Sequence, residues 1–188
     1  MTGSARPEVL VLTGPPGSGK TTVARLLTAR RERAVHLESD LFWRFIASGY
    51  VEPWKPESHE QNMVVMQIVA EVGARHARAG YFTVVDGIVA PRWFYEPLRD
   101  ALTSAGLETA YAILRPPLAL AIERATIRPS TRPLDRSVVE RLWNGFADLD
   151  EALEGHVVDN GELTAEETAA AIEDRLRQGT LTVPSAAT

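Results

Sequence analysis

The fold is decided by Gly14-Pro15-Pro16-Gly17-Ser18-Gly19-Lys20-Thr21, a stretch that matches the phosphate-binding pattern G-x-x-x-x-G-K-[ST]. The apolar run Val9-Leu10-Val11-Leu12 precedes it and predicts a buried strand, and the segment 22–27 that follows has the apolar spacing of a helix. A glycine-rich turn between a strand and a helix leaves backbone N–H groups without intrahelical partners, and these groups attract phosphate. The sequence therefore predicts a site for a nucleoside triphosphate.

The residues of this loop have separable roles. Lys20 is predicted to reach the β- and γ-phosphates, and the Thr21 hydroxyl is predicted to bind Mg²⁺. The two prolines donate no N–H group, so the backbone donors must come from residues 17–21. We therefore expect ATP and Mg²⁺ as cofactors. The predicted nucleotide-binding residues in the loop are Gly14, Gly17, Ser18, Gly19, Lys20, Thr21 and Thr22.

The composition is that of an ordinary soluble domain. The chain has 188 residues, of which 45% are hydrophobic and 24% are charged, so we expect one domain over residues 1–188. A net charge of −5 argues against a nucleic-acid partner. The absence of cysteine excludes disulfides, thiolate zinc sites and cysteine nucleophiles. No signal segment and no apolar run of membrane-spanning length occur, so we expect a cytoplasmic protein without membrane contact.

Strand-like and helix-like segments alternate along the chain. Strand-like runs lie at 8–13, 33–38, 81–86, 108–114 and 155–159. Helical patterns lie at 20–31, 40–48, 57–79, 92–105, 117–127, 136–152 and 164–178. This alternation predicts an α/β fold, in which helices cover both faces of a five-stranded parallel sheet. The small, polar or proline-bearing segments 1–7 and 180–188 are expected to be frayed tails.

Acidic residues follow two of the predicted strands, where open α/β sheets bind their ligands. Glu38 and Asp40 follow the second strand, and their carboxylates suit Mg²⁺ or a hydroxyl awaiting deprotonation. Alternatively, Asp40 only caps the helix that follows it. Asp86 ends an apolar run, which is typical of a Walker B aspartate that holds Mg²⁺. Gly87 is expected to let a substrate approach the backbone closely.

Arginines and aromatic residues border the same region. Arg44 lies one helical turn after Asp40, where it either holds a polar or anionic part of a substrate or only pairs with Asp40. Segment 124–136 carries four arginines around a proline-bearing loop, which predicts a small lid; the alternative is a solvated helix end. Aromatic residues gather in segments 42–54 and 93–95, where they form either core or the wall of an acceptor pocket.

Together these residues resemble the P-loop small-molecule kinases of the P-loop NTPase superfamily, over nearly the whole chain. This group includes shikimate and gluconate kinases, chloramphenicol phosphotransferase and, more distantly, nucleoside monophosphate kinases. The resemblance implies a three-layer α/β/α fold with an arginine-bearing lid. It implies that Glu38 serves Mg²⁺ and that Asp40 serves the substrate as a base. It further implies that Arg124 stacks on adenine and Arg128 contacts phosphates, with segment 159–161 beside the base.

The chain also departs from these relatives. Asp86-Gly87-Ile88 stands where shikimate kinases have a triple glycine, which argues against shikimate as the substrate. The aromatic segment 42–54 is unlike the arginine-rich acceptor site of nucleoside monophosphate kinases. No N-K-x-D guanine motif occurs, which argues against a switch GTPase.

The leading hypothesis is an ATP- and Mg²⁺-dependent phosphotransferase that acts on a hydroxyl of a small molecule, such as an antibiotic or a sugar acid. Asp40, Lys20 and Arg128 are its predicted catalytic residues. Two alternatives stay open. One is a kinase of nucleotides or nucleic-acid ends, and the other is a regulatory module that binds ATP without transferring phosphate.

Overall fold

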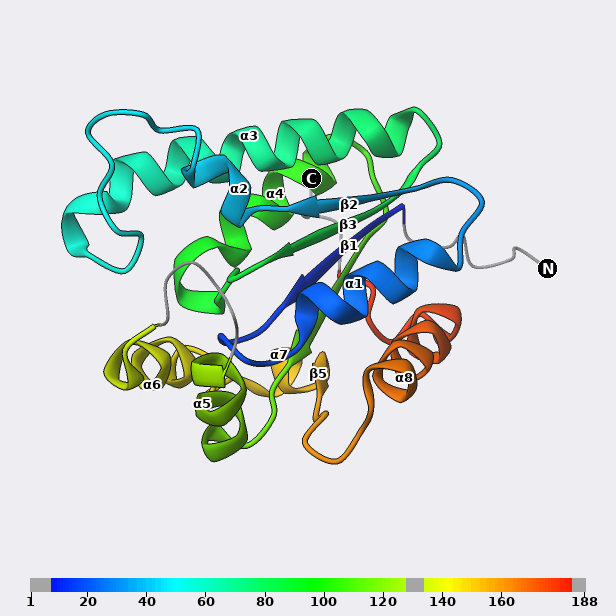
Figure 1. Ribbon diagram of the computed structural model, residues 1–188. Helices are drawn as coiled ribbons and strands as arrows, with labels where there is room; N and C mark the ends of the chain where they lie inside the picture. The colour runs from blue at the N-terminus through cyan, green and yellow to red at the C-terminus, as the bar shows by residue number, and fades with distance from the viewer. Residues whose placement is uncertain (1–7, 128–133, 184–188) are drawn as a thin grey trace.

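The predicted five-stranded parallel sheet is confirmed in the computed structural model, which describes residues 8–127 and 134–183. The strand order is β2-β3-β1-β4-β5, and every neighbouring pair is parallel (Figure 1). The phosphate-binding loop follows the central strand. The strands are β1 (Val9–Thr13), β2 (Ala34–Glu38), β3 (Phe82–Gly87), β4 (Thr109–Leu114) and β5 (Val157–Val158).

Helices cover both faces of the sheet, so the three-layer arrangement is also confirmed. Figure 1 shows α3 (His59–Arg78) and α4 (Glu96–Ser104) on one side of the sheet. On the other side lie α1 (Lys20–Ala29) and α8 (Ala165–Gln178). Strand β1 serves both layers, since successive side chains of a strand point to opposite faces.

The core is accordingly divided in two. Val9 and Val11 of β1 belong to the cluster that contains α3 and α4 residues. Leu10 and Leu12, which alternate with them, pack with residues of α1 and α8. All four side chains are buried, and this double burial explains why β1 is a continuous apolar run without polar alternation.

Two predicted helices are shorter than the sequence pattern suggested. The helix expected over 40–48 is only α2 (Asp40–Trp43), and the chain then turns through Gly49 with φ of +77°. The helix expected over 136–152 is divided into α6 (Arg136–Asn144) and α7 (Glu151–Glu154). The division has a local cause, because the Asp150 side chain accepts a hydrogen bond from Leu153 N and so begins a new helix.

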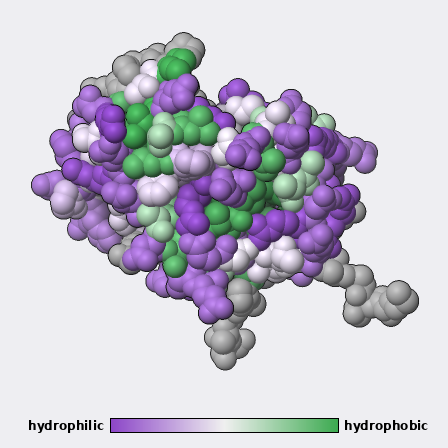
Figure 2. Space-filling model, turned by 90° about the horizontal axis from the view of Figure 1, so that it is seen from below, coloured by the Kyte–Doolittle hydropathy of each residue, from purple (hydrophilic) through white to green (hydrophobic). Residues whose placement is uncertain are grey.

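The remaining helical elements flank the ligand-binding edge of the sheet. They are η1 (Pro56–Ser58), η2 (Pro91–Tyr95), a π-helical turn that leads into α4, and α5 (Leu118–Ile127). In the described part of the chain, no helix is both long enough and apolar enough to cross a membrane. Figure 2, which views the side of Figure 1 that carries α5, α6 and α8, shows exposed apolar residues in separate places between polar ones.

The expectation of a frayed tail from residue 180 onward is wrong for residues 180–183. Leu181 is fully buried and Val183 is 4% exposed. Thr182 bridges Ala110 of β4 in an antiparallel sense, and Tyr111 N donates a hydrogen bond to Leu181 O at 2.9 Å. The segment therefore continues the core beside β4. Residues 1–7 and 184–188, the rest of the expected tails, lie outside the described residues.

Candidate functional site

The phosphate-binding loop adopts backbone conformations that require glycine. Gly17 and Gly19 have φ of +79° and +86°, in the left-handed region that other residues rarely adopt. A Cβ atom at Gly17 would also lie 2.1 Å from the carbonyl oxygen of Ala121 in α5, so the loop packs directly on that helix. Helix α1 begins at Lys20, and its first backbone N–H groups therefore lie at the loop. One predicted donor is already used, because Ser18 N donates to Pro15 O at 3.2 Å.

A cavity of about 310 Å³ lies on one side of this loop. The predicted residues Gly17, Ser18, Gly19, Thr22 and Arg124 line it, and so do Ala165 and Thr168 of α8 and its N-cap Thr164. Glycine backbone, a helix N-terminus and a guanidinium group together suit a polyphosphate with an attached planar base.

Asn160 is a residue of this cavity that sequence reasoning missed. It is 3% exposed, and its Nδ2 donates a hydrogen bond to Ser18 O at 2.8 Å. The contact ties the phosphate-binding loop to the segment after β5, across 142 positions of sequence. The only signal for it in the sequence was its place after a predicted strand, within segment 159–161.

Asp40 lies across the loop from this cavity, as the first residue of α2. The alternative role as a helix cap is not observed, since Ser39 occupies the cap position and makes no side-chain cap bond. Asp40 is exposed to solvent as a residue, yet the protein around its carboxylate removes part of the hydration of that group, and this desolvation raises its pKa. Lys20 and Arg44 lower the pKa, while Asp86 and Glu38 raise it. A carboxylate with a raised pKa beside a lysine is suited to accept a proton.

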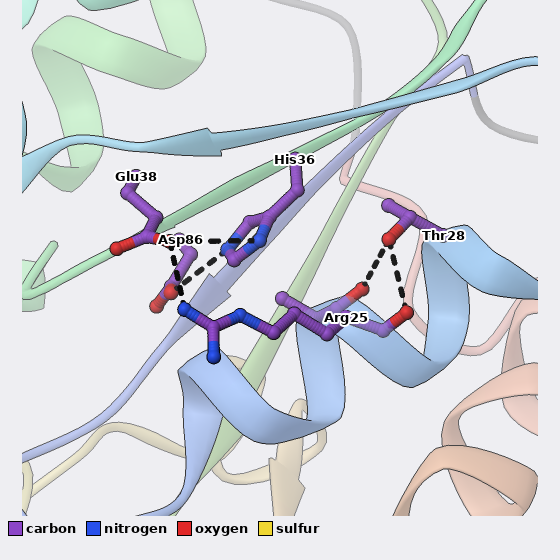
Figure 3. A network of polar contacts seen from close by, with 6 residues as sticks. Arg25, Thr28, His36, Glu38 and Asp86 are labelled. Atoms are coloured by element: carbon purple, nitrogen blue, oxygen red, sulfur yellow. Dashed lines mark hydrogen bonds and ion pairs between the residues drawn. The ribbon is translucent and has the colours of Figure 1, made fainter.

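Asp86 and Glu38 belong to a polar network that also contains His36 and Arg25 (Figure 3). Asp86 is 3% exposed, and its Oδ2 lies 3.1 Å from Nε2 of His36. Glu38 pairs with Arg25 of α1 at 3.3 Å and lies 3.9 Å from His36 Nδ1. The strand register explains the cluster: Glu38 stands opposite Asp86 in the β2–β3 pairing, and His36 is two residues earlier on the same face of β2.

This network separates the two predicted carboxylate ligands of Mg²⁺. Glu38 already has an arginine partner, whereas Asp86 Oδ1 is a buried oxygen with no hydrogen-bond partner among the described residues. Such an oxygen suits a cation or its water, and Thr21, the other predicted ligand, is the second residue of α1. No group of three His, Asp or Glu side chains within residues 8–127 and 134–183 forms a metal site by itself. That is compatible with Mg²⁺, which takes one or two carboxylates together with phosphates and waters.

A second cavity, of about 350 Å³, begins at Pro16, Gly17 and Asp40 and is defined here as the acceptor pocket. Arg44 lines it, and so do aromatic residues from both predicted clusters; a contact of Arg44 with substrate stays a prediction. Gly87 does not line it; Ile88 does. A Cβ atom at Gly87 would lie 1.9 Å from Ser39 Oγ, so this glycine makes room for a protein side chain, and its approach by a substrate stays a prediction.

The predicted lid is only partly described. Arg124 of α5 lines the nucleotide-side cavity, while its neighbour Ala125 lines the acceptor pocket together with Leu134 and Leu142. Helix α5 therefore borders both cavities. Arg128 lies outside the described residues.

Solved structures confirm the resemblance to P-loop small-molecule kinases at the level of the fold. The tunicamycin resistance protein of Deinococcus radiodurans superposes with a TM-score of 0.69 at 19% identity, covering 96% of this chain and 99% of that one. A gluconokinase from Sinorhizobium meliloti 1021 superposes with a TM-score of 0.67 at 18% identity, covering 94% of this chain and 97% of that one. Shikimate kinase from Acinetobacter baumannii superposes with a TM-score of 0.58 at 21% identity, covering 94% of this chain and 96% of that one.

Sequence comparison identifies the family directly. No curated protein matches the chain in a sequence search. A family model described as an AAA domain, however, matches residues 9–153, from the first strand to the α7 helix. This span includes the phosphate-binding loop, Asp40, Asp86 and α5. The chain therefore belongs to this AAA-domain family of P-loop proteins.

Proposed function

We propose that the protein transfers the γ-phosphoryl group of ATP, in the presence of Mg²⁺, to a hydroxyl group of a small molecule. The observation that carries this proposal is the meeting of two cavities at Gly17. One cavity has the features of a nucleotide site, and the other is lined by Asp40. The solved kinases of the same fold lend support, and at this level of identity they leave the acceptor open.

The residues divide the chemistry between them. The hydroxyl oxygen of the acceptor bonds to the γ-phosphorus, and Asp40 accepts the hydroxyl proton. The bond from that phosphorus to the β–γ bridging oxygen breaks at the same time, so ADP leaves. Lys20 donates hydrogen bonds to the phosphate oxygens that gain charge. Arg128 is expected to assist it from the lid. Thr21 and Asp86 would hold Mg²⁺, which when bound neutralises the charge of the β- and γ-phosphates.

The test separates binding from transfer. Asp40→Ala is expected to bind Mg·ATP with nearly unchanged affinity in calorimetry, and to lose about 10²- to 10⁴-fold of acceptor-dependent ADP release. Lys20→Ala is expected to lose both binding and turnover. If no hydroxyl compound accelerates ADP release by the parent protein, the proposal fails and the protein only binds ATP. Turnover with mononucleotides or 5′-hydroxyl oligonucleotides alone would indicate the alternative kinase class.

A further inference from the structure

The acceptor pocket is walled by aromatic side chains from three separate segments. Trp43 comes from α2, Tyr50 and Trp54 from the loop before η1, and Trp93 and Phe94 from η2. Trp43 and Phe94 are buried, whereas Trp93 is 38% exposed and Trp54 is half-buried. The partly exposed rings therefore offer faces to a ligand, beyond their role in the core.

The charges that line the pocket balance. Of the described lining residues, only Asp40 and Arg44 are charged, and they lie one helical turn apart. Arg44 already acts on Asp40, because its charge lowers the pKa of that carboxyl. An acceptor with its own carboxylate or phosphate would bring a second negative charge next to Asp40. Arg44 is the one cation among the described lining residues, and Lys20, the other cation that acts on Asp40, is expected to bind the phosphates. Burying such a charge without a dedicated partner is unfavourable.

Trp43 and the loop that carries Tyr50 and Trp54 are held in place before any ligand binds. Asn62 of α3 is 3% exposed and accepts a hydrogen bond from Trp43 Nε1 at 2.8 Å. Its Nδ2 donates to Pro53 O at 2.8 Å, beside Trp54. Gln61 fixes the same loop one residue after Tyr50, since it accepts from Val51 N at 2.9 Å and donates to Val51 O at 2.7 Å. A wall fixed in this way binds a flat ligand without the entropy cost of ordering itself.

We propose that the acceptor is an uncharged hydroxyl compound with an aromatic or other flat apolar ring, and that Trp54 and Trp93 select it by stacking. This inference rests on the proposed function and narrows it, because it sets anionic hydroxy acids such as gluconate and shikimate aside. The volume of about 350 Å³ lies at the lower end of the range for small-molecule sites, enough for a compact drug-sized acceptor.

Four glycosides test the two halves of this proposal separately. Phenyl and methyl β-glucoside differ only in the group attached to the sugar, which is an aromatic ring in one and a methyl group in the other. Phenyl and methyl β-glucuronide repeat this comparison on a sugar that carries a carboxylate. Three of the four tryptophans line the pocket, so quenching of tryptophan fluorescence reports binding without ATP. Phenyl β-glucoside is expected to bind about tenfold more tightly than each of the other three. Equal affinity of the phenyl and methyl compounds, an absence of binding by all four, or tighter binding of a glucuronide would overturn the proposal.

Variants assign the selectivity to particular rings. Trp54→Ala and Trp93→Ala are expected to weaken the binding of phenyl β-glucoside about three- to tenfold and to leave the binding of methyl β-glucoside unchanged. Phe45→Ala is the matched control, because Phe45 is 75% exposed and does not line the pocket. Circular dichroism and thermal unfolding establish that each variant is folded. If both tryptophan variants bind phenyl β-glucoside as the parent does, the rings do not select the acceptor.

Ligand binding and ADP release, measured separately, distinguish failure of this inference from failure of the proposed function. Selective binding of the phenyl glucoside without any ADP release, for it or for other neutral aryl alcohols, would support the pocket's ligand class and contradict phosphotransfer. ADP release that responds to gluconate but not to aryl compounds would support phosphotransfer and contradict the ligand class.

Discussion

At the scale of single residues, the carboxylates near the loop have different surroundings and therefore different uses. Asp40 is accessible from the acceptor pocket, Asp86 is buried against His36, and Glu38 is paired with Arg25. The sequence predicted all three carboxylates as site residues. It did not reveal their partners, because Arg25 and His36 reach them only through the packing of α1 and the pairing of β2 with β3.

Asp40 is expected to favour activity at the cost of stability. Burial raises its pKa above the ordinary value of 3.8, so the unfolded chain loses this proton at lower pH than the folded protein does. At a pH above the pKa of Asp40 in the folded protein, the ionised carboxylate therefore destabilises the folded state. This effect disappears below about pH 3.8, where the carboxyl is protonated in both states. Asp40→Asn is expected to raise the Tm at neutral pH and to lose this advantage as the pH falls toward 4. Parent turnover should decline over the same acid range, since the base must be ionised.

Thermal unfolding of both proteins across that pH range measures the first effect, and the pH profile of ADP release measures the second. A Tm difference that is zero at neutral pH, or that grows as the pH falls, would contradict the assignment.

Substitutions of Asp86 and Glu38 are expected to differ in their effect on the Mg²⁺ requirement of nucleotide binding. Asp86→Asn should raise the Mg²⁺ concentration needed for stabilisation by a non-hydrolysable ATP analogue about tenfold or more, because Asp86 Oδ1 is buried, has no hydrogen-bond partner among the described residues and is therefore available to an ion. Glu38→Gln serves as the matched comparison and should have a smaller effect, since Glu38 is paired with Arg25. The thermal shift at a series of Mg²⁺ concentrations distinguishes them. A larger effect at Glu38 would reverse the assignment of the metal ligand.

At the scale of elements, helix α5 supports the phosphate-binding loop and borders both cavities. Its Ala121 carbonyl oxygen lies where a side chain at Gly17 would be, and its residues Arg124 and Ala125 line different cavities. The helix itself was predicted from its apolar spacing. Its contact with the loop was not, since about 100 residues separate them in the sequence.

Gly17→Ala is expected to destabilise the protein by about 2–5 kcal/mol, because it combines an unfavourable φ with a clash against Ala121. Gly106→Ala is the matched control. Gly106 has φ of +76° but no atom within 4 Å of the added Cβ, so only the conformational cost of about 1–2 kcal/mol applies. Urea unfolding of both variants isolates the contribution of the contact. Equal losses would show that α5 does not support the loop.

At the scale of the whole molecule, the core consists of two clusters on either side of the sheet, and residues 181–183 contribute to both of them. Leu181 packs with β1, α1 and α8 residues, and Val183 belongs to the opposite cluster. A stretch of Thr, Val and Ser residues near a proline reads locally as a tail. It is ordered because β4 offers it backbone partners at Thr109 and Tyr111.

Leu181→Ala is expected to cost about 2–5 kcal/mol of unfolding free energy, as removal of a fully buried leucine side chain does. Thr182→Ala, next to it, should change stability by less than about 0.5 kcal/mol, because the Thr182 side chain is exposed and its bridge to Ala110 is made by the backbone. Denaturant midpoints at constant m-value give both numbers. A small loss for Leu181→Ala would mean that the segment is dispensable for the core.

The sequence by itself determined the fold class, the order of elements, the phosphate-binding loop and the carboxylates at the strand ends. These features depend on residues close together in the chain, where apolar periodicity, glycine spacing and proline placement act directly. Only the tertiary structure decided the Asn160 contact with Ser18, the partners of Asp86 and Glu38, and the packing of residues 180–183. Those features depend on groups distant in sequence, which hydrogen-bond or bury each other only after the sheet has brought them together.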